Sequence, residues 1–358
     1  MNSEPFISVI ITAHNRKKYI LESANSVFNQ NLPRDKYEVI VVKNFSDEHI
    51  DYSLKKLGAL LVLSESENLG GKILDALKFV NGNIITILED DDLYTPLRLQ
   101  RIYQKFIDSN IGFFYNKQQF IDEEGRPIST KRALKEYSRD CPNLRIQGML
   151  EDKLKYYNLL IRCGMYFNAS SMALRTTLIR DNADKLRELN LMVDVLFFYM
   201  SLMSNYDLIL VPEKLTMYRV SDIRRQCNGM TGLHKIASRA LAEYNSGIVL
   251  REYLKGTPFQ REAIIDFSIH FNSILLELIN NIIKNNSIKS RKSSLLGFVK
   301  SCIRSGKYTS LVWALIAVSP KNLRKRLTIW ALCGSLRDQS TPSHRHESIG
   351  DLRCVPEI

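Results

Sequence analysis

The first hundred residues alternate between short apolar runs and amphipathic stretches, and this alternation constrains the fold more than any other feature. Apolar runs typical of buried strands lie at 7–13, 37–42, 59–63 and 83–88. Between them, residues 19–30, 50–57 and 70–80 repeat apolar side chains with a helical period. Strands and helices that alternate at this spacing predict a parallel sheet with helices on both faces. A further helix is expected over 96–107, with Pro96 in its first turn, where a missing N–H costs nothing.

Four consecutive carboxylates, Glu89, Asp90, Asp91 and Asp92, directly follow the fourth apolar run. They repel one another and have no use in a core, so we place them at the C-terminal end of that strand. Ligands bind at this edge of an open α/β sheet. Hard oxygen ligands there favour a divalent cation and, through it, a phosphate-bearing substrate. From the four residues alone, a solvated acidic turn stays an alternative.

Beyond residue 110 the pattern loosens. We expect strands at 112–115 and 119–122, a loop over 126–150, a strand at 167–174, helices at 176–189 and 194–204, and a strand at 208–211. From about residue 231 the chain becomes helical, with five helices expected near 233–254, 259–284, 291–304, 309–318 and 321–334. These patterns predict one α/β domain over 1–225, a basic helical domain over 226–338 and a disordered tail over 339–358.

The formal net charge of +12 is confined to one segment. Residues 278–337 contain twelve Lys and Arg and no Asp or Glu, so the rest of the chain is neutral. Apolar side chains such as Leu296, Trp313 and Trp330 are interleaved with these cations, which suits helices lying on anionic lipid. A helical domain with a solvated basic face is the alternative. Because the segment matches no nucleic-acid-binding module, no nucleic-acid partner is expected.

Six cysteines are spread over the chain without a C-x-x-C pair, which argues against a zinc site or a disulfide framework and favours a reducing compartment. The N-terminus lacks the basic and apolar regions of a signal peptide. The longest apolar run has eight residues, from Leu311 to Val318, whereas a membrane span needs about twenty. We therefore expect a cytoplasmic protein, soluble or peripheral on the inner face of the cell membrane.

Four blocks of sequence occur in an order and at spacings that resemble a known family. They are ISVIITAHNR (7–16), YEVIVV (37–42), ENLGGK (67–72) and LEDDDLYTP (88–96). Together they resemble the nucleotide-binding half of the family-2 glycosyltransferases, over about residues 6–220. The resemblance implies the GT-A fold, a Rossmann-like and mostly parallel sheet with helices on both faces, followed here by a helical C-terminal domain. It also implies transfer of a sugar from a nucleotide-diphospho-sugar to a hydroxyl acceptor.

The resemblance places the donor site on the first hundred residues. The family's D-x-D motif falls on Glu89, Asp90 and Asp91, which makes Asp91 the first choice to hold Mg²⁺ or Mn²⁺. Asp92 has a comparable claim as a metal ligand, while Glu89 and Asp90 would face the ribose or a metal-bound water. The turn that wraps the base corresponds to Thr12, Ala13, His14 and Arg16, and Lys72 could meet phosphate. For His14, Arg16 and Lys72, ordinary packed or solvated roles stay open.

Two positions depart from the family pattern. The strand-two Asp that reads the base is replaced by Asn44, which offers a different donor and acceptor pattern. The general base expected near the start of a helix corresponds to Asp194, the one carboxylate between Leu191 and Met203, but its partner Glu is replaced by Val193. Apolar neighbours would raise the pKa of Asp194 and suit a base; a helix N-cap is the alternative role.

Three further groups are candidates with ordinary alternatives. The segment 168–171 lies where the family shapes its acceptor side, although it could equally be a polar strand entry. Arg219, Arg224 and Arg225 could clamp the diphosphate from a loop. The Gln-x-x-Arg-Trp signature of processive synthases is missing, so one addition per encounter is expected.

The sequence thus predicts a metal-dependent, inverting and non-processive glycosyltransferase. Its acceptor would be a lipid-linked glycan, a surface polysaccharide or a glycoprotein glycan precursor, and it would contact an anionic membrane surface. A nucleotidyltransferase on a related fold and a non-catalytic sugar-nucleotide-binding protein are the alternatives.

Overall fold

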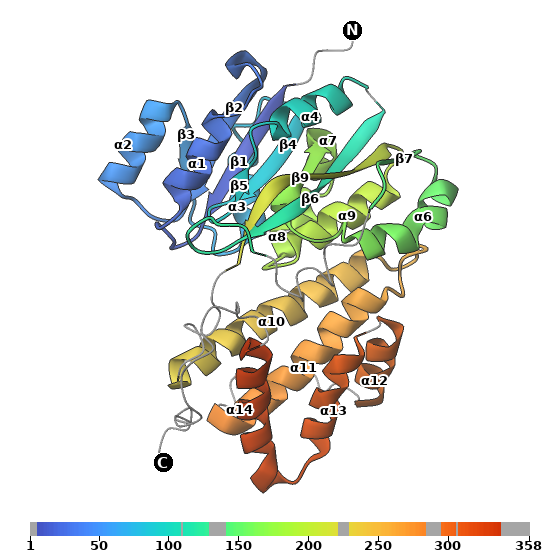
Figure 1. The fold of residues 1–358 in the computed structure, drawn as a ribbon. Helices are drawn as coiled ribbons and strands as arrows, with labels where there is room; N and C mark the ends of the chain where they lie inside the picture. Colours follow the sequence, from blue (N-terminus) through green and yellow to red (C-terminus); the bar gives the residue numbers. More distant parts are fainter. Residues whose placement is uncertain are drawn as a thin grey trace. The chain divides into compact units, whose positions relative to one another are not determined.

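The computed structural model describes residues 6–108, 110–128, 141–220, 229–283, 295–305 and 307–337 (Figure 1). The chain divides into two compact units, Met1–Val220 and Ser221–Ile358. The predicted domain boundary at 225 and the predicted tail over 339–358 both lie outside the described residues.

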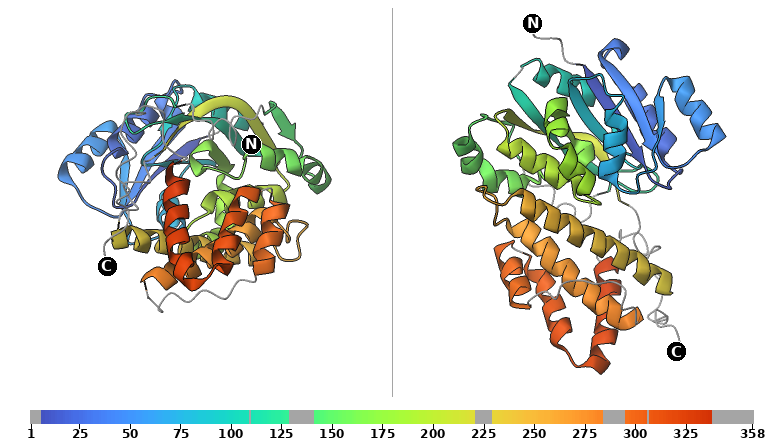
Figure 2. Two further views of the ribbon diagram at one scale, coloured as in Figure 1. Left: turned by 60° about the horizontal axis from the view of Figure 1, so that its bottom comes forward. Right: turned by 180° about the vertical axis from the view of Figure 1, so that it is seen from behind.

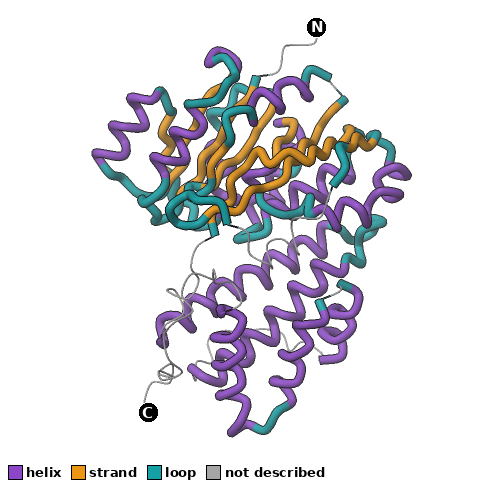
Figure 3. Tube along the Cα trace, in the orientation of Figure 1, coloured by secondary structure: helices purple, strands orange, loops and turns teal. Residues whose placement is uncertain are grey.

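The first unit is built on one mixed sheet of nine strands among the described residues, in the order β3-β2-β1-β4-β8-β6-β9-β5, with β7 paired to β9 (Figure 3). Strands β1 to β4 pair in parallel, β8 runs antiparallel between β4 and β6, and β6 pairs with β9 in parallel. The strands are β1 (Ile7–Ala13), β2 (Tyr37–Lys43), β3 (Leu60–Leu63), β4 (Ile84–Glu89), β5 (Leu93–Tyr94), β6 (Ile111–Ile121), β7 (Leu144–Ile146), β8 (Met172–Arg175) and β9 (Asp207–Arg219). The predicted α/β sheet is confirmed.

The strand register brings the ends of the first strands together. Thr12 is the partner of Glu89 across β1 and β4, and Ala13 is the partner of Lys43 across β1 and β2. The residues that follow these three strands therefore meet at one edge of the sheet, where ligands bind in open α/β folds.

Helices cover both faces of this sheet (Figures 1 and 2). On one face, alternate residues of β1, β2 and β4 form a core with α1, α2 and α4, because side chains on a strand alternate between faces. On the other face, α3 contacts β1, β2 and α8. The helices are α1 (Ile20–Phe28), α2 (Glu48–Leu57), α3 (Leu69–Leu77), α4 (Arg98–Phe106), α6 (Leu150–Cys163), α7 (Thr176–Asp181), α8 (Ala183–Glu188) and α9 (Val193–Met203).

The second half of this unit differs from its prediction. The two strands expected at 112–115 and 119–122 are one strand, β6, and the closing strand β9 continues eight residues past Val211. Pro212 is tolerated inside β9 because the pairing with β6 skips from Val211 to Lys214, so a bulge removes the need for its missing N–H. The helix expected at 176–189 is interrupted at Asn182. Helix α6 was not predicted, and α4 begins two residues after Pro96.

The expectation that the cysteines would not pair was wrong. Cys141 and Cys163 form a disulfide with 5.8 Å between their Cα atoms. Twenty-two residues separate them, and the fold rather than a short motif brings them together. The spacing of the cysteines therefore gives no argument for a reducing compartment.

The second unit is helical, as predicted. It contains α10 (Gly229–Tyr253), α11 (Ala263–Ile283), α12 (Leu295–Arg304), α13 (Leu311–Val318) and α14 (Lys321–Arg337). Helix α10 packs along α11, and α12, α13 and α14 also contact α11. Over the described part of the chain, every helix is too short or too polar to cross a membrane.

Candidate active site

The acidic tetrad lies on a backbone turn that three other segments hold in place. The Asp90 N–H donates to Thr12 O of β1 at 3.2 Å. The Ser23 hydroxyl of α1 lies 2.8 Å from both Asp90 O and Asp92 O, and Arg219 Nε of β9 donates to Asp91 O at 2.8 Å. The turn is therefore fixed from three sides, and its carboxylates have defined directions.

These carboxylates have different environments. Asp92 is buried, and its Oδ1 accepts the Arg219 N–H at 3.0 Å, while its Oδ2 is buried and accepts no hydrogen bond from the described residues. The Asp91 side chain is 18% exposed. Asp91 faces the open edge of the sheet, whereas Asp92 faces the interior.

Burial raises the pKa of several of these groups. It raises the pKa of Asp90 to about 7, although Arg16 opposes the shift. It also raises the pKa of Asp92 to about 7, with Asp91 adding to the effect. The pKa of Glu89 lies well above its ordinary value because of burial first and then the charges of Asp91 and Asp92. Burial and mutual repulsion thus favour the protonated forms of these carboxyl groups, and a nearby cation opposes that effect.

Arg16 supplies a cation within the protein. Its guanidinium bonds to Asp90, and its Nη1 donates to Asp91 Oδ2 at 2.5 Å. The Arg16 side chain is half exposed, so its position can change without opening the core. The structure thus joins Arg16, which the sequence assigned to the turn around the base, to two carboxylates of the tetrad.

The ends of β1 and β2 meet through an asparagine pair. The Asn15 N–H donates to Asn44 Oδ1 at 2.8 Å, and Asn44 Nδ2 donates to Asn15 Oδ1 at 3.1 Å. His14 lies next to this pair, with its Nε2 3.3 Å from Asn15 Nδ2 and 3.8 Å from a Glu67 carboxylate oxygen. Burial and the nearby Lys72 charge lower the pKa of His14, so neutral imidazole is favoured. Asn44, which replaces the usual Asp, therefore orders the turn after β1.

Lys72 is buried on α3 rather than extended toward the tetrad. Its ammonium donates to Ser66 O in the loop before the helix, and burial lowers its pKa. The neighbouring Gly70 allows α3 to approach α8 closely, since an added Cβ would lie 1.9 Å from Leu186 O. In the structure the Lys72 side chain therefore holds the loop at Ser66, before α3, and does not reach the tetrad.

A chain of hydrogen bonds links Asp194 to the tetrad. Asp194, in the first turn of α9, accepts the Asn168 N–H at 2.9 Å. Asn168 Oδ1 accepts the Ser170 N–H at 3.0 Å, and Ser170 Oγ accepts the Glu89 N–H at 3.1 Å. The charge of Asp194 also raises the pKa of Glu89, so the two carboxylates lie on one site. The N-cap of α9 is Met192 and not Asp194.

Strained backbone is concentrated around the same residues. Within the described ranges, the non-glycine residues with positive φ are Asn15, Asn168 and Met192. Asn15 follows β1, Asn168 donates to Asp194, and Met192 precedes the helix that carries Asp194. Such conformations cost about 1–3 kcal/mol each and cluster at functional sites.

Sequence reasoning missed or misplaced several supporting residues. Ser23 lies on the apolar face of α1, three residues after Ile20, and a lone hydroxyl on such a face was the available signal. Arg219 was grouped with mobile diphosphate ligands, but it is buried and bonds to Asp91 O, Asp122 O, Glu123 O and Glu22. Arg224 and Arg225 lie outside the described residues.

A single-carboxylate metal site fits these residues. The described ranges contain no group of three or more His, Cys, Asp or Glu side chains arranged around one ion. Mg²⁺ is commonly held by one or two carboxylates, with substrate phosphates and waters completing the shell. Asp91 suits that arrangement, because its carboxylate reaches the open edge and its present partner is a half-exposed cation.

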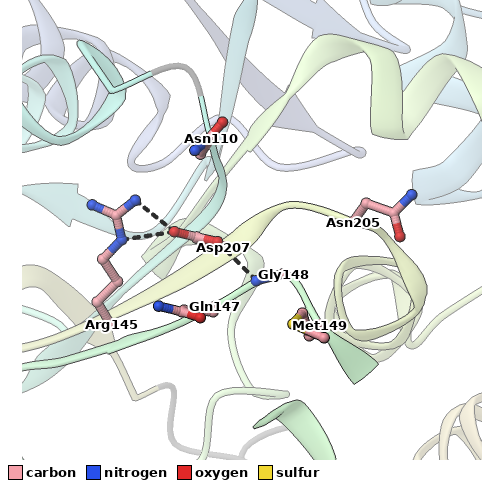
Figure 4. Close-up of a pocket in the computed structure, with 7 residues that line it drawn as sticks. All are labelled: Asn110, Arg145, Gln147, Gly148, Met149, Asn205 and Asp207. Carbon is pink, nitrogen blue, oxygen red and sulfur yellow. Dashed lines mark hydrogen bonds and ion pairs between the residues drawn. The ribbon is translucent and has the colours of Figure 1, made fainter. Parts of the chain in front are cut away.

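A separate hollow lies at the starts of β6 and β9, the opposite edge of the sheet (Figure 4). It has a volume of about 550 Å³, and Asp207 on its wall accepts from Arg145 Nε at 2.7 Å and from the Gly148 N–H at 2.8 Å. It lies at the opposite ends of the strands from the acidic tetrad, so it does not belong to the acidic site.

Comparison with known proteins agrees with this architecture. The family described as Glycosyl transferase family 2 matches residues 8–177. A glycosyltransferase of Methanocaldococcus jannaschii is 27% identical over 184 residues, which cover 46% of this chain and 63% of that protein. A poly(ribitol-phosphate) beta-glucosyltransferase of Bacillus spizizenii is 29% identical over 34% of this chain and 20% of its own length. The chain thus spans less than two thirds of the length of each of these curated relatives.

Solved structures share the fold. A mannosyltransferase from Pyrobaculum calidifontis in complex with GDP-Man and Mn²⁺ has a TM-score of 0.51 at 15% identity, covering 94% of this chain and 88% of that chain. Residues 1–349 of S. aureus TarS have a TM-score of 0.50 at 17% identity, covering 93% and 88%. The predicted GT-A fold is confirmed, and residues 8–177 of the chain match the family-2 glycosyltransferases that the sequence resembles.

Proposed function

We propose that this enzyme transfers a sugar from a nucleotide-diphospho-sugar to a hydroxyl acceptor, with inversion and one addition per encounter. The observation that carries the proposal is the hydrogen-bonded chain from Asp194 through Asn168 and Ser170 to Glu89. It connects a candidate base to the acidic tetrad within a single site, so that the base could act on the face of the anomeric carbon opposite the departing diphosphate, as in-line displacement requires.

The donor would lie over the ends of β1, β2 and β4. Main-chain groups of Thr12 and Ala13, with His14 and Asn44, would surround the base, and Glu89 and Asp90 would face the ribose side. The pairing of Asn44 with Asn15 supports a role in shaping this turn. Lys72 would hold the loop at Ser66 and keep the nearby His14 neutral rather than contact phosphate.

Asp91 would hold Mg²⁺ or Mn²⁺ together with the diphosphate. Such an ion neutralises charge that develops on a departing nucleoside diphosphate. We keep Asp91 and not Asp92 in this role, because Asp92 is buried and its Oδ1 is bound to the Arg219 N–H. Arg16 would leave Asp91 and turn toward the diphosphate when the donor binds.

Asp194 would take the proton of the acceptor hydroxyl as that oxygen attacks the anomeric carbon. The Asn168 N–H and the N–H of Val195, at 2.9 Å, hold its carboxylate in one orientation. A lipid-linked glycan, a surface polysaccharide or a glycoprotein glycan precursor is the proposed acceptor class, at the cytoplasmic side of the membrane.

A panel of nucleotide sugars tests the donor proposal. Thermal unfolding is measured for each sugar nucleotide with and without Mn²⁺, and products are identified by mass. We expect one donor to raise the unfolding temperature only with Mn²⁺, and to release a nucleoside diphosphate. Release of pyrophosphate from nucleoside triphosphates would instead indicate a nucleotidyltransferase. Binding without turnover over a panel of acceptors would indicate a non-catalytic binding protein.

A further inference from the structure

The outward face of α12, α13 and α14 is apolar and basic. The described residues of the second unit include nine exposed large apolar side chains, and all lie between Leu295 and Trp330. None lies on α10 or α11 among those residues. The most exposed are Leu296, Tyr308, Leu315, Val318 and Trp330, at 60–69%.

Seven of these side chains share one face on each of the three helices, while Leu295 precedes Leu296 on α12 and Tyr308 lies before α13. On α12 they are Leu296 and Ile303, with Lys300 between them. On α13 they are Val312, Leu315 and Val318, and on α14 they are Leu323 and Trp330, with Arg326 between them. Spacings of three, four and seven residues align side chains along one side of a helix. Each helix thus presents an apolar stripe, and two of the stripes include a cation.

The opposite sides of the same helices form the core of the unit. Phe298 of α12 and Trp313 of α13 are buried, and Phe271 of α11 lies 6.3 Å and 5.9 Å from their ring centroids. In Figures 1 and 2, α12, α13 and α14 lie along α11 on the side away from α10. The exposed stripes therefore are not needed to complete the packing against α11.

The charge of this region selects the partner. From residue 278 to 337 the chain has twelve basic residues and no acidic one. A second copy would bring an equally basic face against this one, with like charges opposed. An anionic lipid surface offers the complementary charge and a headgroup region that accepts Trp, Leu and the stems of Lys and Arg.

We propose that the outward face of α12, α13 and α14 docks on an anionic phospholipid bilayer, with Leu296, Leu315 and Trp330 entering the headgroup region. Binding combines burial of these side chains with attraction between Lys300 and Arg326 and the lipid charge. It requires no spanning helix and does not depend on the donor chemistry of the first unit.

The chain provides its own reporter for this contact. Its two tryptophans are Trp313, which is 8% exposed, and Trp330, which is 65% exposed. In a Trp313→Phe variant, Trp330 is the single indole, and its emission reports on this face. Vesicles of phosphatidylcholine alone and vesicles that also contain phosphatidylserine are added at low and high salt.

We expect a blue shift of the Trp330 emission with phosphatidylserine vesicles, and its loss at high salt, where charges are screened. If Trp313→Phe does not fold, the unsubstituted chain is used instead, with its emission and its co-flotation with vesicles as the readouts. Because Trp313 is buried, a vesicle-dependent change in that emission is assigned to Trp330. Arg326→Gln should weaken partitioning roughly fivefold, and Leu315→Ser should weaken it further. Tyr52→Ser, at a 68% exposed side chain of α2, is the matched control and should not change binding.

Absence of a shift and of flotation with anionic vesicles would overturn the proposal. Binding that Leu315→Ser and Arg326→Gln leave unchanged would also overturn it. Sedimentation velocity without lipid tests whether a second copy of the chain occupies this face. A dimer that Leu315→Ser dissociates would assign the face to that second copy instead.

Discussion

The Arg16 guanidinium donates to Asp91 at 2.5 Å, so the chain's own cation lies on the carboxylate proposed to hold a metal. A divalent ion must compete with this ion pair. Replacement of Arg16 by Gln removes the competing charge, and we expect Mn²⁺ alone to bind about tenfold more tightly, which corresponds to about 1.4 kcal/mol. Isothermal titration of Mn²⁺ without donor measures the change.

The matched control for this prediction is Lys17→Gln. Lys17 is also half exposed and lies next to Arg16, but it pairs with Asp47 at 2.9 Å, away from the tetrad. Its removal should leave Mn²⁺ binding unchanged. Equal or weaker Mn²⁺ binding in Arg16→Gln would show that Arg16 does not compete at Asp91.

Ser170 is expected to position Glu89 rather than to react. Its hydroxyl accepts the Glu89 N–H at 3.1 Å, so Ser170→Ala leaves that donor without its partner at a cost of about 1–3 kcal/mol. We expect a lower unfolding temperature together with a lower kcat at nearly constant acceptor KM. Ser170→Thr keeps the hydroxyl and should recover part of the loss in kcat. A variant Ser170→Ala with wild-type kcat would remove Ser170 from this role.

Lys153 should make stability depend on pH in alkaline solution. Its ammonium is buried against the C-terminal end of α9, where it donates to Ser201 O at 3.0 Å and Ser204 O at 2.5 Å. Burial lowers its pKa from 10.5 to about 8. Between these two values the unfolded chain binds more protons than the folded chain, so the free energy of unfolding rises with pH.

Comparison with Lys153→Met isolates this effect. Burial also lowers the pKa of Lys117 to about 8, but Lys117 is present in both proteins and cancels in the difference. Urea unfolding at a series of pH values should show the stability of the natural chain increasing relative to Lys153→Met from pH 8 to pH 10. A difference that stays flat or falls would contradict the assigned shift.

The first half of the first unit could be predicted because its signals are local. Strands β1, β2 and β4 are largely apolar and buried, the edge strand β3 is apolar, and α1 to α3 repeat with a helical period, so local patterns indicate these elements. Glu89 and Asp91 could be placed at a strand end for the same reason. What the sequence could not show was that Asp92 would be buried and Asp91 partly exposed, because the buried Asp92 bonds to Arg219, 127 residues away in the chain.

The second half depends on contacts between distant segments. Strand β6 reads as two pieces because it contains the polar run 116–119, but Asn116 is buried and bonds to Thr216 Oγ1 at 3.0 Å and to Arg98. Helix α6 has a weakly patterned sequence, and its last residue is joined to Cys141 by a disulfide that no motif announces. Contacts with distant segments therefore determine where β6 and α6 form, and the periodicity of their own sequences does not.

Asp194→Asn tests the central claim most directly, because amide and carboxylate have nearly the same shape but the amide cannot accept the proton. Donor affinity and the single-turnover transfer rate should be measured in the same variant, with Asn182→Ala, at the junction of α7 and α8, as a control. We predict an unchanged donor Kd, an unfolding temperature lowered by the loss of one hydrogen bond, since the amide has only one oxygen for the Asn168 and Val195 N–H groups, and a transfer rate lower by a factor of about 10²–10⁴. Transfer at the rate of the natural chain would show that Asp194 is not the base.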